Sequence, residues 1–544
     1  MTEYTGKGVY GAIAIGNIKV FKRQKLTITK TTITDVENEI LRVTKAKESS
    51  MAQLQQIYEK ALKDVGEENA QIFQIHLLLL DDEDYNQSIV DTIESQKVNA
   101  EYAVSVTAET FSNMFSSMDD DYMKERAIDI KDISNRLISN LMDEGSNDSN
   151  SNEKVIVCAD DLAPSETVLL DKDRVLAFVT AYGSSNSHTS ILARSMNIPA
   201  VIGVGRQFLD AIKDGDHAIV DGYSGKVYLN PNDETTKEYH SKMLADQQDR
   251  QRLQLLKGKE DITLDGTKVK LYANIGSPKD VKSVLLNDAN GIGLFRSEFL
   301  YLESSDYPTE DQQFEAYKSV LQGMDGKRVI IRTLDIGADK KVDYFNLDRE
   351  ENPALGYRAI RICLTRPEVF KTQLRALYRA SVYGNLGIMF PMITSVKELE
   401  SILAICQEVK QELSSKSIEY SNSTQLGIMI ETPASAIISD RLAPMVDFFS
   451  VGTNDLTQYT LACDRQNANV ESFCDTHHEA ILRLIEMATI NAHKNNIWIG
   501  ICGELASDTT LTETFLKMGI DELSVSPNFV LKVREAIRSV DLSK

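Results

Sequence analysis

A chain of 544 residues is too long for one compact core, and at about 100 to 200 residues per domain it is expected to hold two to four domains. The formal net charge of −22 disfavours a nucleic-acid partner, because such proteins need a clustered excess of Lys and Arg. No apolar stretch reaches about 18 residues and residues 1–15 contain no basic start or apolar leader, so we expect a cytoplasmic protein without membrane insertion.

The first half of the chain changes from strand-like to helical patterns and back. Residues 1–20 alternate as short strands with glycine turns do, whereas residues 34–142 show helical periodicity with almost no Gly or Pro. A polar run closes this helical block, and strand-like segments then return. We predict an α/β domain at 1–30 and 145–232, a helical bundle inserted into it at 31–144, and a helical linker at 233–260.

The second half of the chain, 261–544, alternates strand-like and helical segments. Most of the strand-like segments are continuous apolar runs, which is typical of buried parallel strands. Eight such units over this length predict a (β/α)8 barrel, although a doubly wound open sheet fits the same periodicity. The eight candidate strands are 269–273, 291–294, 329–333, 387–391, 427–431, 448–452, 497–502 and 522–525.

Charged side chains follow the ends of several of these strands, where the βα loops of a barrel build the site. Glu431 and Asp455, on neighbouring strand ends, suit a hard divalent cation such as magnesium, which also takes phosphate oxygens from a substrate. Arg296 and Arg332 suit a carboxylate and a phosphate. Cys502 ends the seventh strand, where a thiol is either buried structure or a weak acid. The pattern predicts a small polyanionic ligand.

His188 lies between a turn of small residues, 183–186, and an apparent helix. Small neighbours allow close approach, and the helix amides favour a phosphoryl group there. Imidazole is a competent nucleophile near neutral pH. The local pattern therefore makes His188 a candidate phosphoryl acceptor, although a single histidine is more often structural or simply exposed.

From Gly8 to about Arg538 the chain resembles Enzyme I of the bacterial phosphoenolpyruvate:sugar phosphotransferase system. The resemblance rests on several motifs rather than on one. They are SHTSILAR at 187–194, GIGLFRSEFL at 291–300, IRTLDIG at 331–337, ENPALGYR at 351–358, IETP at 430–433, SVGTNDLTQY at 450–459 and CGELA at 502–506.

The resemblance implies a phosphoenolpyruvate-protein phosphotransferase, which takes the phosphoryl group of phosphoenolpyruvate onto its own histidine and passes it to the phosphocarrier protein HPr as the first step of sugar uptake. It implies that His188 is phosphorylated and steadied by Thr167, and that Cys502 protonates the enolate of pyruvate. It also implies ligand roles for a further set of residues. They are Glu431 and Asp455 for Mg²⁺, with Mn²⁺ as the alternative, and Arg296, Arg332, Arg358, Asn454, Asp455 and Arg465 for phosphoenolpyruvate.

The resemblance further implies a swivelling histidine domain, HPr docking on the helical insert, and a homodimer formed through the barrel. Positions that resemble the docking surface also fit ordinary helix surface or core; they are Glu67, Glu68, Phe73, His76, Leu79 and Arg126. One departure concerns the turn before the histidine, which reads Gly-Gly-Arg-Thr in the family and Gly183-Ser184-Ser185-Asn186 here. We expect this change to alter the rate rather than abolish activity.

Three other classes of protein share parts of this sequence pattern. Phosphoenolpyruvate synthase and pyruvate phosphate dikinase have a similar histidine domain and barrel, but they need an additional nucleotide-binding domain for which this chain has no glycine-rich loop. A nitrogen-signalling paralogue carries an extra N-terminal sensory domain. A binding module without turnover would have little reason to keep His188, Cys502 and the strand-end residues, and it would release no pyruvate.

Overall fold

The computed structural model describes residues 1–21, 28–64, 67–117, 121–142, 153–160, 162, 174–183, 189–190, 193–194, 198–302, 304–337, 342–348, 350–465 and 467–544. The chain forms two compact units, Met1–Asp249 and Arg250–Lys544, which are described separately below. No helix in these described ranges is long and apolar enough to cross a membrane.

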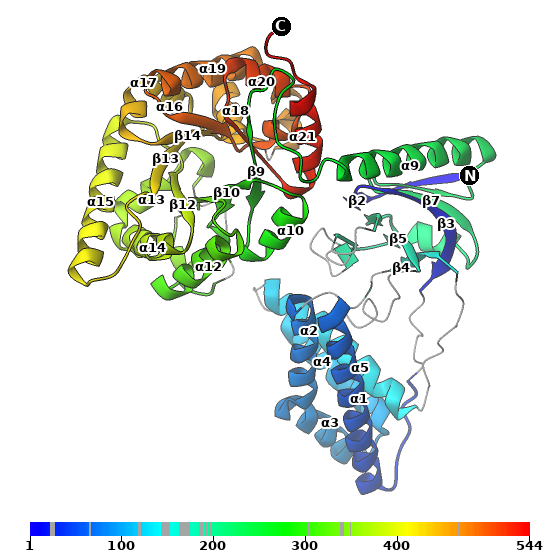
Figure 1. Ribbon diagram of the computed structural model, residues 1–544. Helices are drawn as coiled ribbons and strands as arrows, with labels where there is room; N and C mark the ends of the chain where they lie inside the picture. The colour runs from blue at the N-terminus through cyan, green and yellow to red at the C-terminus, as the bar shows by residue number, and fades with distance from the viewer. Residues whose placement is uncertain are drawn as a thin grey trace. The chain divides into compact units, whose positions relative to one another are not determined.

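The first unit contains an eight-stranded mixed sheet in the order β1-β8-β7-β3-β4-β5-β6-β2 (Figure 1). Strand β3 pairs in parallel with β4 and antiparallel with β7, so the segment between β3 and β4 leaves and re-enters one sheet. The strands are β1 Thr2–Thr5, β2 Lys7–Tyr10, β3 Ile13–Val20, β4 Val155–Ala159, β5 Val175–Thr180, β6 Ala200–Ile202, β7 His217–Asp221 and β8 Lys226–Leu229, with helix α8 at Arg206–Ala211.

The segment between β3 and β4 is helical, as predicted. Its helices bury one face each around a common core that includes Leu54, Phe73 and Ile133, all with no exposed surface. A bundle can therefore be inserted into the sheet domain without contributing a strand to it. The helices are α1 Val36–Asp64, α2 Glu67–Asp81, α3 Glu83–Gln96, α4 Ala100–Ser116 and α5 Asp121–Leu141. Helix α9, Asp233–Gln254, then leads from the sheet toward the second unit.

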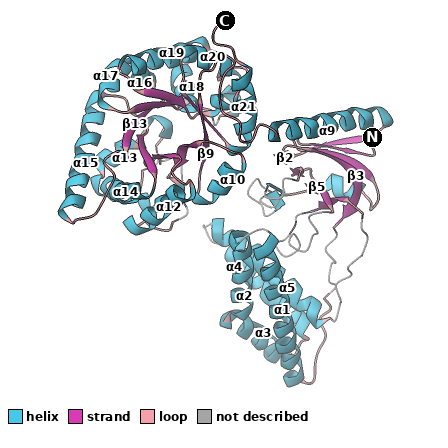
Figure 2. Cartoon of the chain, in the orientation of Figure 1, coloured by secondary structure: helices cyan, strands magenta, loops and turns pink. Residues whose placement is uncertain are grey.

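The second unit is a closed barrel of eight parallel strands, which excludes the open sheet (Figure 2). Closure is made by β16 against β9, whose registers run from Glu522↔Lys270 to Val525↔Ala273. The strands are β9 Lys270–Ile275, β10 Gly291–Arg296, β11 Arg328–Arg332, β12 Asn385–Phe390, β13 Gln425–Ile430, β14 Phe448–Val451, β15 Trp498–Ile501 and β16 Glu522–Val525. All eight lie within a few residues of the predicted positions.

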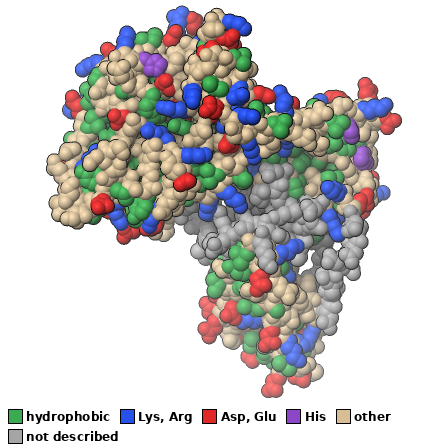
Figure 3. Space-filling view, viewed as in Figure 1, with side chains coloured by type: hydrophobic (Ala, Val, Ile, Leu, Met, Phe, Trp, Pro, Cys, Tyr) green, Lys and Arg blue, Asp and Glu red, His purple; other side chains and the backbone are tan. Residues whose placement is uncertain are grey.

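Helices surround the barrel and cover its strands. Continuous apolar strands result because one face packs on these helices and the other on the barrel interior. The α-helices are α10 Val281–Leu286, α11 Phe299–Leu302, α12 Glu310–Gly323, α13 Ile360–Thr365, α14 Pro367–Ala380, α15 Val396–Ser415, α16 Pro433–Ile437, α17 Ser439–Leu442, α18 Thr453–Leu461, α19 Glu479–Lys494, α20 Thr512–Met518 and α21 Val530–Ser539. On the visible face of this unit, basic and acidic side chains are interspersed (Figure 3).

The barrel interior contains a small apolar cluster and one carboxylic acid. The cluster includes Met429 and Phe448, and Phe448 stacks on Trp498 with ring centroids 4.5 Å apart. Glu522 is fully buried beside Gly500, where an added β-carbon would lie only 1.7 Å from its Oε2 atom. Burial raises the pKa of Glu522 to about 8, against the opposing effect of Lys270.

We predict that Glu522→Gln removes a pH dependence of barrel stability. A carboxyl with a raised pKa keeps its proton in the folded barrel, whereas the unfolded chain loses it near pH 4.5. The free energy of unfolding of the wild type should therefore fall as pH rises from about 5 to 8, with a slope of at most about 1.4 kcal/mol per pH unit. Urea denaturation followed by the fluorescence of Trp498, the single tryptophan, reports on this unit. Glu513→Gln, on an exposed helix, serves as control, and identical pH slopes for wild type and Glu522→Gln would contradict the prediction.

Candidate functional site

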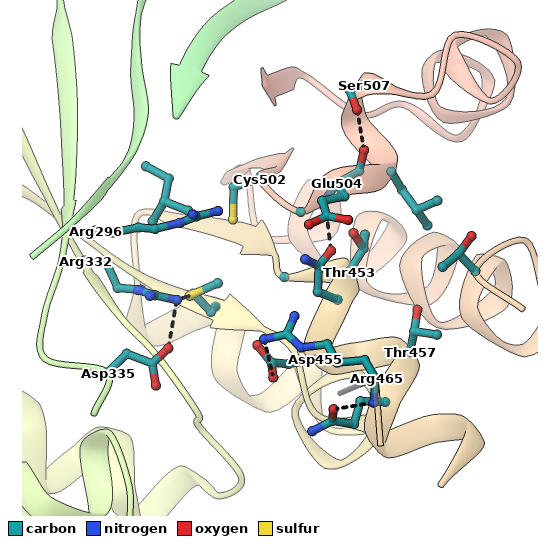
Figure 4. A pocket seen from close by; sticks show the side chains of 18 of the residues that line it. Arg296, Arg332, Asp335, Thr453, Asp455, Thr457, Arg465, Cys502, Glu504 and Ser507 are labelled. Atoms are coloured by element: carbon teal, nitrogen blue, oxygen red, sulfur yellow. Dashed lines mark hydrogen bonds and ion pairs between the residues drawn. The ribbon is translucent and has the colours of Figure 1, made fainter. Parts of the chain in front are cut away.

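A cavity of about 830 Å³ opens at the carboxyl ends of the barrel strands (Figure 4). It collects side chains that are far apart in the sequence but follow neighbouring strands. The predicted residues that line it are Arg296, Arg332, Arg358, Asn454, Asp455, Arg465 and Cys502. The structure therefore brings seven of the ten predicted site residues to one place, and an eighth, Glu431, lies directly behind its wall.

Two buried arginines form the basic side of the cavity. Arg332 ends β11, is 6% exposed, and pairs with Glu298 and, at 3.0 Å, with Asp335. Arg358 is 5% exposed and donates to the other oxygen of Asp335 at 2.8 Å. Asp335 thus holds both guanidinium groups, and each Nε atom remains without a hydrogen-bond partner in the described chain.

The neighbouring carboxylates keep these two arginines charged. Burial alone would lower the pKa of Arg332, but Glu298 and Asp335 outweigh this effect and raise it. Burial likewise would lower the pKa of Arg358, but the charges of Asp335 and Asp455 raise it. Fixed, desolvated guanidinium groups bind planar carboxylate and phosphate groups more strongly than mobile surface cations do.

Two carboxylates form the acidic side. Glu431 is fully buried, and its Oε1 atom accepts a 2.6 Å bond from the amide of Met392. Asp455, on the first turn of α18, lies 3.9 Å from Arg358 Nη1 and 3.8 Å from Arg465 Nη2. Burial and then the charge of Asp455 raise the pKa of Glu431 well above its usual range. These two carboxylates therefore repel each other unless a proton or a cation lies between them.

The donor set fits a divalent cation shared with a substrate. Glu431 Oε2 and Asp455 Oδ1 are buried and have no hydrogen-bond partner among the described atoms. No group of three or more His, Cys, Asp or Glu side chains in the described ranges is arranged to hold a metal alone. Two carboxylates completed by water and phosphate oxygens are the usual arrangement for magnesium.

The first turn of α18 adds a third feature. The helix begins at Thr453, after Gly452, so its unbonded amides face the cavity and favour an anion. Asn454 Oδ1 accepts a 3.0 Å bond from the amide of Glu504, which ties the helix to the loop after β15. Gly503 permits this approach, because a β-carbon there would lie 2.0 Å from Thr453 Oγ1.

Cys502 follows β15 and brings a thiol to the same cavity. It is 2% exposed, and burial raises its pKa to about 12. Such a thiol stays protonated at neutral pH, so it can donate a proton but is a poor nucleophile. Arg296 and Arg465 also line the cavity and, unlike the buried pair, are exposed.

Two predicted residues, His188 and Thr167, lie outside the described residues. Thr189 and Ser190, which directly follow His188 in the sequence, are fully buried. The sequence interpretation missed Glu298 and Asp335 as site residues, although both lie inside the quoted motifs. The sequence did contain a signal for both: Asp335 lies three residues after Arg332, and Glu298 lies two residues after the end of β10.

In the helical insert, the structure decides between the surface and core alternatives for three of the positions that resemble the docking surface. Phe73 and His76 have no exposed surface, and Arg126 is 8% exposed. His76 Nε2 lies 3.1 Å from Asp129 Oδ1, and Arg126 Nη1 lies 2.7 Å from Asp129 Oδ2. These three residues therefore belong to the bundle interior. Leu79 is half-buried, and the side chains of Glu67 and Glu68 lie outside the described atoms.

Comparison with known families gives matches along the chain. Residues 250–542 match the PEP-binding domain of PEP-utilising enzymes, residues 5–126 their N-terminal domain, and residues 151–225 their mobile domain.

Individual relatives match over nearly the full length. A protein of Priestia megaterium named phosphoenolpyruvate-protein phosphotransferase is 45% identical over 99% of this chain and 94% of its own. The protein of the same name from Bacillus subtilis (strain 168) is 45% identical over 99% of this chain and 94% of its own. A solution NMR structure of Enzyme I (nEIt) is 39% identical over 45% of this chain and 99% of its own, with a TM-score of 0.40.

Proposed function

The chain belongs to the phosphoenolpyruvate-protein phosphotransferases, and we propose that it moves the phosphoryl group of phosphoenolpyruvate first to its own His188 and then to HPr. That it is a phosphoenolpyruvate-dependent phosphotransferase of the sugar phosphotransferase system follows from the family. The acceptor residue, the partner, the metal and the roles of single site residues are the proposal.

The observation that carries the proposal is the cavity itself. It collects two buried arginines, Asp455 and the first residues of α18, and Glu431 lies against Gly452 of the cavity lining. Phosphoenolpyruvate is a small trianion at most, with one carboxylate and one phosphate, and this arrangement supplies a binding group for each. Arg296, Arg332, Arg358, Asn454 and Arg465 are proposed to hold it.

In the proposed reaction the bond between phosphorus and the enol oxygen breaks while a bond from phosphorus to a ring nitrogen of His188 forms. The arginines neutralise charge on the phosphoryl oxygens and fix their direction, which is the main requirement of phosphoryl transfer. The enolate left behind takes a proton at its methylene carbon from the thiol of Cys502 and leaves as pyruvate. Thr167 is proposed to steady the His188 ring.

Mg²⁺, with Mn²⁺ as an alternative, is the proposed divalent ion, held by Glu431 and Asp455. Held there, such an ion would neutralise negative charge on the phosphate. Glu431 Oε2 and Asp455 Oδ1, which accept no hydrogen bond within the described residues, support this assignment.

We assign a separate role to each domain. Residues 1–30 and 145–232 carry His188, residues 31–144 bind HPr, residues 233–260 link, and residues 261–544 bind phosphoenolpyruvate and dimerise in the cytoplasm. Because His188 must meet both the cavity and HPr, a hinge movement about the linker is also proposed.

Pyruvate release tests the proposal. Wild-type protein with phosphoenolpyruvate and Mg²⁺ should release one pyruvate per active site and then stop, whereas excess HPr should make release continuous. Chelation of divalent ions should abolish both phases. Binding of phosphoenolpyruvate without any release of pyruvate would instead identify a binding module.

A further inference from the structure

The carbonyl of Cys502 is held by a side chain rather than by a sheet ladder. Strand β15 pairs with β16 at only two positions, Gly500↔Glu522 and Ile501↔Leu523, and Cys502 follows the second. Beyond these two β15–β16 pairs, the Cys502 carbonyl accepts a 2.9 Å hydrogen bond from Nδ2 of Asn274. Asn274 belongs to β9, two strands away around the barrel.

The amide of Asn274 is fully engaged in this position. Its Nδ2 also donates to the carbonyl of Ser524 at 3.1 Å, and its Oδ1 accepts from Ser524 Oγ at 2.6 Å. Ser524 is fully buried. A carboxamide has two N–H donors and one carbonyl, so every group of Asn274 has a partner here and its orientation is fixed.

The other side of Cys502 is fixed by the main chain. The amide of Cys502 donates to the carbonyl of Val451 on β14 at 3.1 Å. With Asn274 on its carbonyl, Cys502 is therefore held from both neighbouring sides, just where the chain leaves the barrel for the loop at Glu504–Ser507. The backbone fixes where the thiol starts, its Sγ atom lies 3.7 Å from the Val451 carbonyl, and Cys502 lines the cavity.

We propose that Asn274, oriented by Ser524, is a positioning residue for proton transfer from Cys502. This inference rests on the proposed role of Cys502 as proton donor. In that step the S–H bond breaks, the new C–H bond forms at the methylene carbon of the enolate, and the thiol is left as a thiolate that regains a proton from water after pyruvate departs. Asn274 touches no reacting atom.

The test separates cleavage of the phosphate ester from protonation of carbon. Enolpyruvate released into D2O persists long enough to be seen by its ultraviolet absorbance before it becomes pyruvate. Wild type, Cys502→Ala, Asn274→Ala and Ser524→Ala are each mixed with phosphoenolpyruvate, Mg²⁺ and excess HPr. We expect direct pyruvate from the wild type, enolpyruvate from Cys502→Ala and from Asn274→Ala, and a smaller amount from Ser524→Ala.

The rate of direct pyruvate formation should fall about 10- to 100-fold in Asn274→Ala, because small misplacement of a reacting group has effects of this size. Phosphorylation of the protein should change less than about threefold. Asn495→Ala is the matched control, since its amide donates to a helix carbonyl, that of Asn491, away from the cavity.

Two results would overturn the inference. Direct pyruvate formation by Asn274→Ala and Ser524→Ala, while Cys502→Ala releases enolpyruvate, would show that the thiol needs no such support. Direct pyruvate from Cys502→Ala would remove Cys502 as donor and the inference with it. If Asn274→Ala does not fold, Ser524→Ala, which loses only one hydroxyl, decides between these outcomes. A wild type that forms neither product would refute the proposed function instead.

Discussion

Replacing Arg332 with alanine is expected to lower kcat/KM for phosphoenolpyruvate about 1,000-fold, a loss of about 4 kcal/mol in transition-state binding. The guanidinium is 6% exposed and already oriented by Glu298 and Asp335. Its removal takes away a charge proposed to contact the phosphoryl group, and it costs the buried Glu298 and Asp335 carboxylates one of their cationic neighbours, which is itself unfavourable. Steady-state pyruvate release with excess HPr measures the effect.

Arg332→Lys should be nearly as damaging, because one ammonium group cannot hold Glu298, Asp335 and a ligand in the planar fork geometry of a guanidinium. Arg328→Lys is the control. Arg328 begins the same strand, and its Nη1 contacts Gln425 at the opposite end of the barrel. If Arg328→Lys lost as much activity as Arg332→Lys, the loss would have to come from disturbing strand β11 rather than from removing a group in the cavity.

Glu431→Gln and Asp455→Asn are each expected to reduce turnover about 1,000-fold and to remove its dependence on divalent ions. Each substitution keeps the shape of the side chain but deletes one of the two negative charges that a hard cation requires. In the wild type, Mg²⁺ should also raise the melting temperature, because a ligand that binds only the folded state stabilises it. Differential scanning calorimetry with and without Mg²⁺ should show this rise in the wild type only.

Asp440→Asn, at an exposed position of α17, should keep both the activity and the Mg²⁺ effect of the wild type. A Mg²⁺-induced rise in melting temperature that survives in both Glu431→Gln and Asp455→Asn would place the cation elsewhere. Full activity of either variant would remove that carboxylate from the site.

The architecture of the second unit could be predicted because buried parallel strands leave continuous apolar runs, and all eight were located from such runs. The sequence predicts a barrel but does not exclude an open sheet, because closure depends on the pairing of β16 with β9, about 250 residues apart in the chain. Periodicity reports which residues are buried locally and carries no information on which edges meet.

The candidate site could be predicted at the strand ends but not in its supporting contacts. Arg332, Glu431, Asp455 and Cys502 stood out because each ends or follows a strand. Two supporting contacts could not be predicted: Asp335 binding both Arg332 and Arg358, and the hydrogen bond from Asn274 to the Cys502 carbonyl. Both depend on how distant parts of the chain pack together, which a sequence alone does not give. In the helical insert, the sequence left His76 open between helix surface and core, and the structure buries its ring with Nε2 bonded to Asp129 inside the bundle.

The most direct test of the central claim is to locate the phosphoryl group. Wild type and His188→Ala are incubated with ³²P-labelled phosphoenolpyruvate and Mg²⁺, and the labelled peptide is mapped. We predict acid-labile, alkali-stable label on the peptide that contains His188, and none on the variant. Equal labelling of His188→Ala, or no label on wild type with substrate and metal in excess, would contradict phosphoryl transfer through His188 and direct attention to the altered turn at Ser184-Ser185-Asn186.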